Sequence, residues 1–149
     1  MNQDEKNNLK LIGNNKEDLK VISAYAQDSI VAVKDIVFLG KNRIFIMMIN
    51  RFMWEDVKKG VLGKSRRIRC AIRFEQVLTV KSKEINQKNK NKLLECLAIQ
   101  CKEISDNNYE IKIFFSGDNI ITLISETIEV ILCDLGEAWS AKHIPKHKI

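Results

Sequence analysis

The chain has 149 residues, of which 45% are hydrophobic and 30% charged, and its formal net charge is +6 at neutral pH. This length suits one folded domain, and this composition excludes a chain that is disordered throughout. The longest apolar run, residues 44–49, is far shorter than the roughly 20 residues of a membrane span, and the polar N-terminus lacks a secretory pattern. We therefore expect a cytoplasmic protein without a transmembrane segment.

The first predicted elements are a strand and a helix. Residues 1–8 are polar and are expected to form a disordered tip. Residues 9–12 predict a short strand, and a helix over about 16–29 follows, capped by Asn14 or Asn15. Apolar side chains recur along it at helical spacing and predict a buried face, formed by Leu19, Ile22, Ala26 and Ile30.

After the helix, the apolar period changes to two, which is typical of strands. Residues 36–39 and 43–52 are β-rich runs, and the turn chemistry of residues 40–42 predicts a hairpin between them. Residues 55–65 predict a mobile basic loop. A long strand over 67–81 follows, and we expect it to bend or bulge because strands of this length often serve two sheets.

The remaining chain is mainly predicted strand. Residues 81–92 form a polar loop with five lysines, and strands are expected over 93–104, 109–115 and 120–125. Residues 126–135 fit either period, because their apolar side chains match a helix and also alternate as in a strand. We expect a short closing helix here and keep a strand as the alternative.

Together these elements predict a single α+β domain over residues 9–141, followed by a frayed basic tail at 142–149. Its mainly antiparallel sheet of about six strands is expected to form a bent sandwich like the pleckstrin-homology fold, with an N-terminal helix and the closing helix. An open antiparallel sheet with the helices on one face is the alternative.

Motifs for catalysis or metal binding are missing from the sequence. The glycines form no phosphate-binding loop, and His143 and His147 flank Pro145, which disrupts a helical metal site. The cysteines lack zinc or thioredoxin spacing and are predicted to be reduced thiols of the core: Cys70, Cys96, Cys101 and Cys133. We expect no metal and no cofactor, and the sequence favours a protein that is not an enzyme. Glu55 beside Trp54 is the one carboxylate whose pKa an aromatic neighbour could raise.

Charge is sorted along the chain. Residues 41–92 carry fifteen Lys and Arg against four acids, whereas residues 93–138 carry nine acids against two lysines. Such a division predicts either a polarised surface that attracts acidic partners or two blocks that pair across the folded sheet.

The arginines of the long strand are the main candidate binding residues. Arg67, Arg69 and Arg73 alternate on one face at about 7 Å per two residues, close to the phosphate repeat of an extended nucleic-acid strand. A guanidinium also suits phosphate bidentately. The candidate site is completed by flanking residues, namely Arg51, Trp54, Lys58, Lys59 and Lys64.

Two motifs stand out, Asn-Arg-Phe-x-Trp-Glu at 50–55 and Asp-Leu-Gly-x-x-Trp at 134–139, accompanied by the stretches 19–28 and 67–81. In these stretches the chain resembles a bacterial family of uncharacterised single-domain proteins, the domain-of-unknown-function family 2948. The resemblance implies a small cytoplasmic protein without an assigned activity. It also implies that Arg51, Trp54 and Trp139 belong to the family's pattern.

Three hypotheses of function follow. The first is a non-enzymatic binding module whose basic arginine face contacts an acidic protein partner or nucleic acid. The second is a self-associating structural or adaptor protein, in which the basic middle of one copy meets the acidic end of another. The third is a small enzyme that uses Glu55 in a pocket.

Overall fold

The computed structural model describes residues 8–58 and 65–141, so most of the predicted tip, the end of the basic loop and the predicted tail lie outside the described residues. The helices are α2 (Lys16–Ala26), the 3-10 turn η1 (Val33–Asp35) and α3 (Trp54–Lys58). The strands are β1 (Lys10–Gly13), β2 (Ile30–Ala32), β3 (Ile36–Leu39), β4 (Ile44–Phe52), β5 (Arg66–Phe74), β6 (Val77–Lys83), β7 (Leu93–Ser105), β8 (Asn108–Phe115), β9 (Asn119–Ser125) and β10 (Val130–Ser140).

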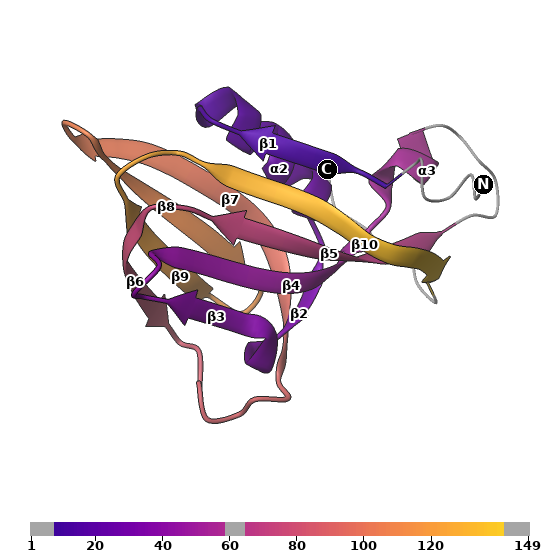
Figure 1. Ribbon diagram of the computed structural model, residues 1–149. Coiled ribbons are helices and arrows are strands. Elements are labelled where there is room, and N and C mark those ends of the chain that lie inside the picture. The colour runs from indigo at the N-terminus through magenta and orange to yellow at the C-terminus, as the bar shows by residue number, and fades with distance from the viewer. Residues whose placement is uncertain (1–7, 59–64, 142–149) are drawn as a thin grey trace.

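These ten strands form one open antiparallel sheet in the order β1-β10-β5-β4-β2-β7-β8-β9-β6, with β3 added to β4. The sheet bends into two layers that Figure 1 shows one behind the other. The front layer contains β1, β10, β5, β4 and β3, and the back layer contains β7, β8, β9 and β6. The short strand β2 connects the layers, because Ile30 pairs with both Asn50 of β4 and Glu95 of β7.

The long strand predicted over 67–81 is divided between the two layers, as the expected bend requires. β5 pairs with β4 and β10 in the front layer, while β6 pairs with β9 in the back layer. The chain crosses between them at Glu75 and Gln76, and Gln76 has a positive φ of 55°. A left-handed backbone conformation at a residue other than glycine marks a tight change of direction.

The closing helix expected over 126–135 is wrong, because Val130–Ser140 is the strand β10. Val130, Leu132 and Asp134 are buried at alternate positions. β10 lies between β1 and β5, which satisfy its backbone groups on both edges. Gly136, expected near a helix end, has a φ of 72° and lies where the β10–β5 register shifts, and this conformation favours glycine.

The predicted N-terminal helix is confirmed as α2, although it ends three residues early. The side chain of Asn15 caps it by accepting a hydrogen bond from the backbone N–H of Asp18, at 2.8 Å. The side chains of Leu19, Ile22 and Ala26 are at most 1% exposed, and the helix contacts β1, β4 and β7. α2 therefore packs against both layers beside β1, as Figure 1 shows.

The core fills the space between the layers, and its side chains come from the inward faces of both: Phe45, Met47 and Ile72 from the front, Ile111, Ile113 and Leu123 from the back. The expected α+β class is confirmed, but the described residues form ten strands where about six were expected, and the pleckstrin-homology likeness stays a prediction. None of the helices in the described ranges is long and apolar enough to cross a membrane.

Candidate functional site

Arg51 is completely buried, which the interpretation of Arg51 as part of an exposed basic face did not anticipate. It is placed there by the alternation of β4, whose inward positions are Phe45, Met47, Ile49 and then Arg51. A buried charge is tolerated only when it is paired and hydrogen-bonded. Arg51 therefore needs acidic partners inside the protein.

Two carboxylates supply them. Arg51 donates from Nε to Asp134 Oδ1 at 2.7 Å and from Nη2 to Asp134 Oδ2 at 2.8 Å. It also donates from Nη1 and Nη2 to the two carboxylate oxygens of Glu55, at 2.9 and 2.7 Å. The Cζ of Arg51 lies 5.5 Å from the centre of the Tyr25 ring, and the backbone N–H of Leu9 donates to Asp134. We call Arg51, Glu55 and Asp134 the buried arginine cluster.

Electrostatic interactions favour the charged forms of Arg51 and Glu55. Burial alone would lower the pKa of Arg51, but the hydrogen bonds that Arg51 donates to Asp134 and Glu55, together with their negative charges, outweigh burial and raise the pKa. Burial alone would raise the pKa of Glu55, but hydrogen bonding to Arg51 lowers it below the ordinary value. The rise in the pKa of Glu55 that its aromatic neighbour could have caused is therefore not found, and Glu55 acts as an ion-pair partner of Arg51.

Trp54 begins α3, and the rest of this helix occupies the start of the loop predicted over 55–65. Its indole N–H donates to the backbone carbonyl of Gln27 at 2.8 Å, and its ring packs against Phe52 at 4.6 Å between centroids. Trp54 thereby anchors α3 to the segment that follows α2. Lys58 ends α3, while Lys59 and Lys64 lie outside the described residues.

The predicted arginine face does exist on β5. Arg67, Arg69 and Arg73 occupy alternate positions and are half-buried or exposed, while the positions between them are buried. This face is turned away from Arg51, because Arg51 pairs in register with the buried Ile68. The structure therefore separates Arg51 from the three arginines with which the sequence grouped it.

Each arginine of this face has a partner within the protein. Arg69 lies 3.3 Å from a carboxylate oxygen of Asp35, and Arg73 lies 2.6 Å from one of Glu75. Arg67 donates to the backbone carbonyls of Asp28 and Asn50, both at 3.0 Å, and lies 5.7 Å from the ring centre of Phe52. An anionic ligand at this face would have to displace these contacts.

The basic block, residues 41–92, and the acidic block, residues 93–138, form only some of their ion pairs with each other. Arg51 with Asp134, and Arg43 with Glu126 at 2.9 Å, do join the basic block to the acidic one. Arg69 and Arg73 instead pair with acids that lie outside the acidic block, and Arg66 does the same with Asp56. Within the described residues, the acidic side chains therefore pair mainly with arginines, and most of the lysines form no ion pair.

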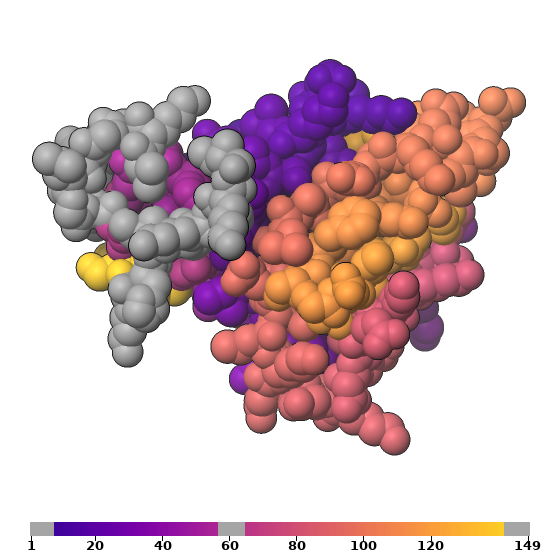
Figure 2. Space-filling model, turned by 180° about the vertical axis from the view of Figure 1, so that it is seen from behind, coloured from indigo at the N-terminus to yellow at the C-terminus, as the bar shows by residue number. Residues whose placement is uncertain are grey.

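The lysines of β6 and the following loop, which the sequence predicted only as part of a polar loop, form a second basic surface. We define the lysine surface as Lys81, Lys83, Lys88, Lys90 and Lys92, all of them exposed. None of the nine ion pairs found within residues 8–58 and 65–141 includes one of these lysines. In Figure 2 this segment, pink to salmon, lies at the lower edge, far from α2 at the top.

The loop that carries these lysines is fastened to the front layer. The backbone N–H groups of Val33 and Lys34 in η1 donate to the carbonyls of Lys92 and Lys90, at 3.0 and 2.9 Å. The side chain of Asn86 accepts from the backbone N–H of Lys88 at 3.0 Å. These contacts give the loop a defined path and hold its lysines together at one end of the molecule.

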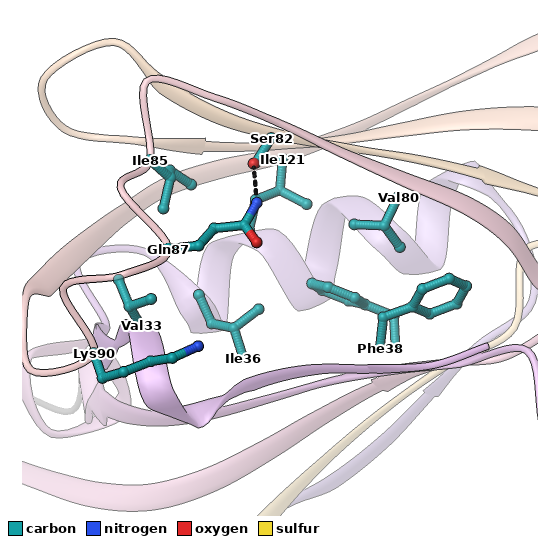
Figure 3. Close-up of a pocket in the computed structure, with 10 residues that line it drawn as sticks. Val33, Ile36, Phe38, Val80, Ser82, Ile85, Gln87, Lys90 and Ile121 are labelled. Atoms are coloured by element: carbon teal, nitrogen blue, oxygen red, sulfur yellow. Dashed lines mark hydrogen bonds between the residues drawn. The ribbon is translucent and has the colours of Figure 1, made fainter.

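A pocket of about 270 Å³ opens beside this loop, between the unpaired edges of β3 and β6. Figure 3 shows side chains from both strands and from the loop facing the same space. We call it the seam pocket, since it lies where the bent sheet fails to close. Its lining residues are Val33, Ile36, Phe38, Phe45, Val80, Ser82, Ile85, Gln87, Lys90 and Ile121.

Sites for metal chemistry are not found in the part of the chain that the structure describes, where no three His, Cys, Asp or Glu side chains gather to hold an ion. His143 and His147 lie outside that part. All four cysteines are free, with Cys70 and Cys96 buried and Cys101 and Cys133 partly exposed. The predicted burial of the thiols therefore holds fully for two of the four.

The fold and these sites define a small α+β protein, built on an open bent antiparallel sheet that is fastened by a buried arginine cluster. The chain belongs to the family described as Protein of unknown function (DUF2948), whose model matches residues 9–147. No curated protein and no solved structure matches the chain. The resemblance drawn from the sequence is confirmed, and its two motifs meet in the buried arginine cluster through Arg51, Glu55 and Asp134.

Proposed function

We propose that this protein is a non-enzymatic binding module whose lysine surface contacts single-stranded nucleic acid through the phosphate backbone. The observation that carries the proposal is the contrast between the two basic surfaces. The arginines of β5 are engaged by Asp35, Glu75 and backbone carbonyls, whereas the five lysines are exposed and take part in none of the ion pairs within the described residues. The basic face of the original hypothesis thus moves from β5 to β6 and its loop.

The chemistry of the lysine surface suits a sequence-independent contact. A lysine ammonium is a compact point charge on a flexible stem, which follows a phosphate chain without reading bases. Lys81 and Lys83 alternate along β6, and Phe38 nearby on the pocket rim is 37% exposed and offers one ring for stacking. Five adjacent positive charges with Glu84 as the single acid of residues 81–92 give a local field that attracts a polyanion.

The test is fluorescence anisotropy of a labelled 20-nucleotide mixed-sequence strand across a salt series. The variant reverses Lys83, Lys88 and Lys92 to Glu, and its matched control reverses Lys10, Lys20 and Lys102, which are exposed on other elements. Each lost phosphate contact should reduce the slope of log K against log salt by about 0.7, so the variant should lose a slope of about 2. The control should keep the wild-type slope.

Two outcomes would overturn this proposal. Equal weakening of the variant and the control would mean that net charge alone drives binding. Tighter binding of polyglutamate than of the strand would assign the lysine surface to an acidic protein instead.

Self-association is the second candidate, because β3 pairs only with β4 among the described residues and exposes Val37, Phe38 and Leu39. An exposed apolar edge strand is a template for pairing with another chain. Sedimentation of the same samples should show a dimer if this candidate is right. Substituting Val37 with Lys should then return the protein to a monomer, and a monomeric wild type would remove the candidate.

A further inference from the structure

The seam pocket is an apolar cavity that the sheet leaves uncovered. Seven of its ten lining side chains are apolar, and the deepest of them, Phe45 and Ile121, are 1% and 3% exposed. β3 and β6 do not pair with each other, so no strand of residues 8–58 and 65–141 covers this part of the core. An apolar surface of this kind gains free energy when an apolar group displaces water from it.

The pocket has three polar lining residues, Ser82, Gln87 and Lys90, which come from the end of β6 and the loop that follows it. Gln87 donates from Nε2 to the hydroxyl of Ser82 at 3.0 Å, which holds both side chains in place. Lys90 is the one charged residue in the lining. Figure 3 shows its side chain at the lower left of the pocket, with the ammonium group beside Ile36 in this view. A cation and two hydrogen-bonding side chains at the mouth of an apolar cavity fit a ligand with an apolar body and an anionic head.

The charges around Lys90 strengthen this preference. Its neighbours in the loop include Lys88 and Lys92, while Glu84 is the only acid between residues 81 and 92. The backbone of Lys90 is fixed by the hydrogen bond from Lys34, so the ammonium stem starts from a defined point. A negative head group would therefore be attracted to this rim, and a positive one repelled.

The volume sets the size of the ligand. A water-sized group takes about 30 Å³, so the cavity of about 270 Å³ holds roughly ten non-hydrogen atoms. That is too small for a nucleotide and matches an aliphatic chain of about eight carbons. We infer that the seam pocket binds a medium-chain aliphatic carboxylate, with its chain between β3 and β6 and its carboxylate beside Lys90, Gln87 and Ser82.

This inference does not rest on the proposed function. The nucleic-acid test reverses Lys83, Lys88 and Lys92 and leaves Lys90 unchanged. Either proposal can therefore be refuted without refuting the other.

The test is a titration of the folded protein with octanoate, followed by amide chemical shifts in NMR spectra. For a ligand of this size we expect a Kd on the order of 1 mM, with shifts centred on β3, β6 and the loop. Octan-1-ol should bind less tightly than octanoate, and octylammonium least tightly. Equal affinities for octanoate and octylammonium, or shifts centred elsewhere, would overturn the inference.

Variants separate the apolar contact from the charge. Val80, half-buried on β6, lines the pocket, and Val80→Phe should fill the cavity and weaken octanoate at least tenfold. Lys90→Met should weaken octanoate about threefold to fivefold without affecting octanol, since an exposed ion pair contributes little more. Lys88→Met, on the same loop but outside the lining, is the matched control. It removes a more distant charge and should weaken octanoate less than Lys90→Met does.

A second variant covers the case in which Val80→Phe does not fold. Ile85→Asp places a carboxylate on the half-buried loop side of the pocket and should abolish octanoate binding by repulsion. If octanoate still binds to Ile85→Asp with wild-type affinity, the ligand does not occupy the seam pocket and the inference is wrong.

Discussion

Replacing Arg51 with Met should destabilise the protein severely, because it leaves two carboxylates without their shared cation. Arg51 is fully buried, and the side chains of Asp134 and Glu55 are 2% and 23% exposed. Methionine fills most of the volume but removes four hydrogen bonds at 2.7–2.9 Å. Asp134 then loses its only cationic partner among the described residues and keeps the hydrogen bond from the backbone N–H of Leu9.

The magnitude follows from the position of the charge. Removing one partner of a buried ion pair lowers the free energy of unfolding by about 3–5 kcal/mol. The whole free energy of unfolding of a domain is about 5–15 kcal/mol. Urea unfolding monitored by tryptophan fluorescence measures the loss. The double variant Arg51→Met with Asp134→Asn should recover part of it, since the uncompensated charge is then neutralised.

Arg43→Met is the matched control for this experiment. Arg43 pairs with Glu126 at 2.9 Å, a similar distance, but the two side chains are 52% and 44% exposed. A pair in that environment contributes about 0–1 kcal/mol. A loss below 1 kcal/mol for Arg51→Met, or a similar loss for both variants, would refute the argument that burial makes the arginine cluster essential.

Two further predictions concern protonation. Because the pKa of Glu55 is lowered in the folded protein, Glu55 stabilises the fold above its ordinary value of 4.5, and this stabilisation is lost as the pH falls through the folded pKa. The melting temperature of wild type should thus fall more steeply below pH 4.5 than that of Glu55→Gln, and parallel curves would contradict this. Burial raises the pKa of Cys96 to about 12 and also raises that of Cys70. Iodoacetamide at pH 8 should therefore modify both at least tenfold more slowly than Cys133 in native protein, as mass spectrometry can follow, whereas similar rates would show that the core opens readily.

The sequence predicted correctly the helices and strands that are specified by residues within a short segment, such as a helix cap or a turn. The cap at Asn15 located the start of α2, and turn residues located the hairpin of β3 and β4. The alternation through Ile68, Cys70 and Ile72 gave the buried face of β5 correctly. These signals depend on backbone geometry that a short segment decides by itself.

The identity of β10 could not be predicted in the same way. Its apolar side chains fit both periods, and the choice is made by neighbours distant in sequence, namely β1 and β5. The seam pocket is also a long-range result, since it exists because β3 and β6 remain unpaired. The alternation of apolar residues predicts which face of a strand is buried, but it does not predict which strands pair along their edges.

The buried arginine cluster, by contrast, left a signal in the sequence. Arg51 continues the inward alternation of Phe45, Met47 and Ile49, and Asp134 continues that of Val130 and Leu132. Two opposite charges at the ends of apolar alternations predict a buried pair, because each would otherwise be uncompensated in the core. Because Arg51 was grouped with the other arginines by charge alone, its buried pair with Asp134 was not predicted.

The position of β10 between β1 and β5 has a consequence for synthesis on the ribosome. Cys133 pairs with Lys10 of β1, and Asp134 pairs with Cys70 of β5. The strand β10, which is synthesised late, therefore supplies the backbone hydrogen-bond partners of two strands that are synthesised much earlier. At about 5–20 residues per second, β5 waits roughly 3–13 seconds between its own synthesis and that of β10. During that interval its edge stays open, and a chaperone or a neighbouring nascent chain can reach it before the protein's own strand does.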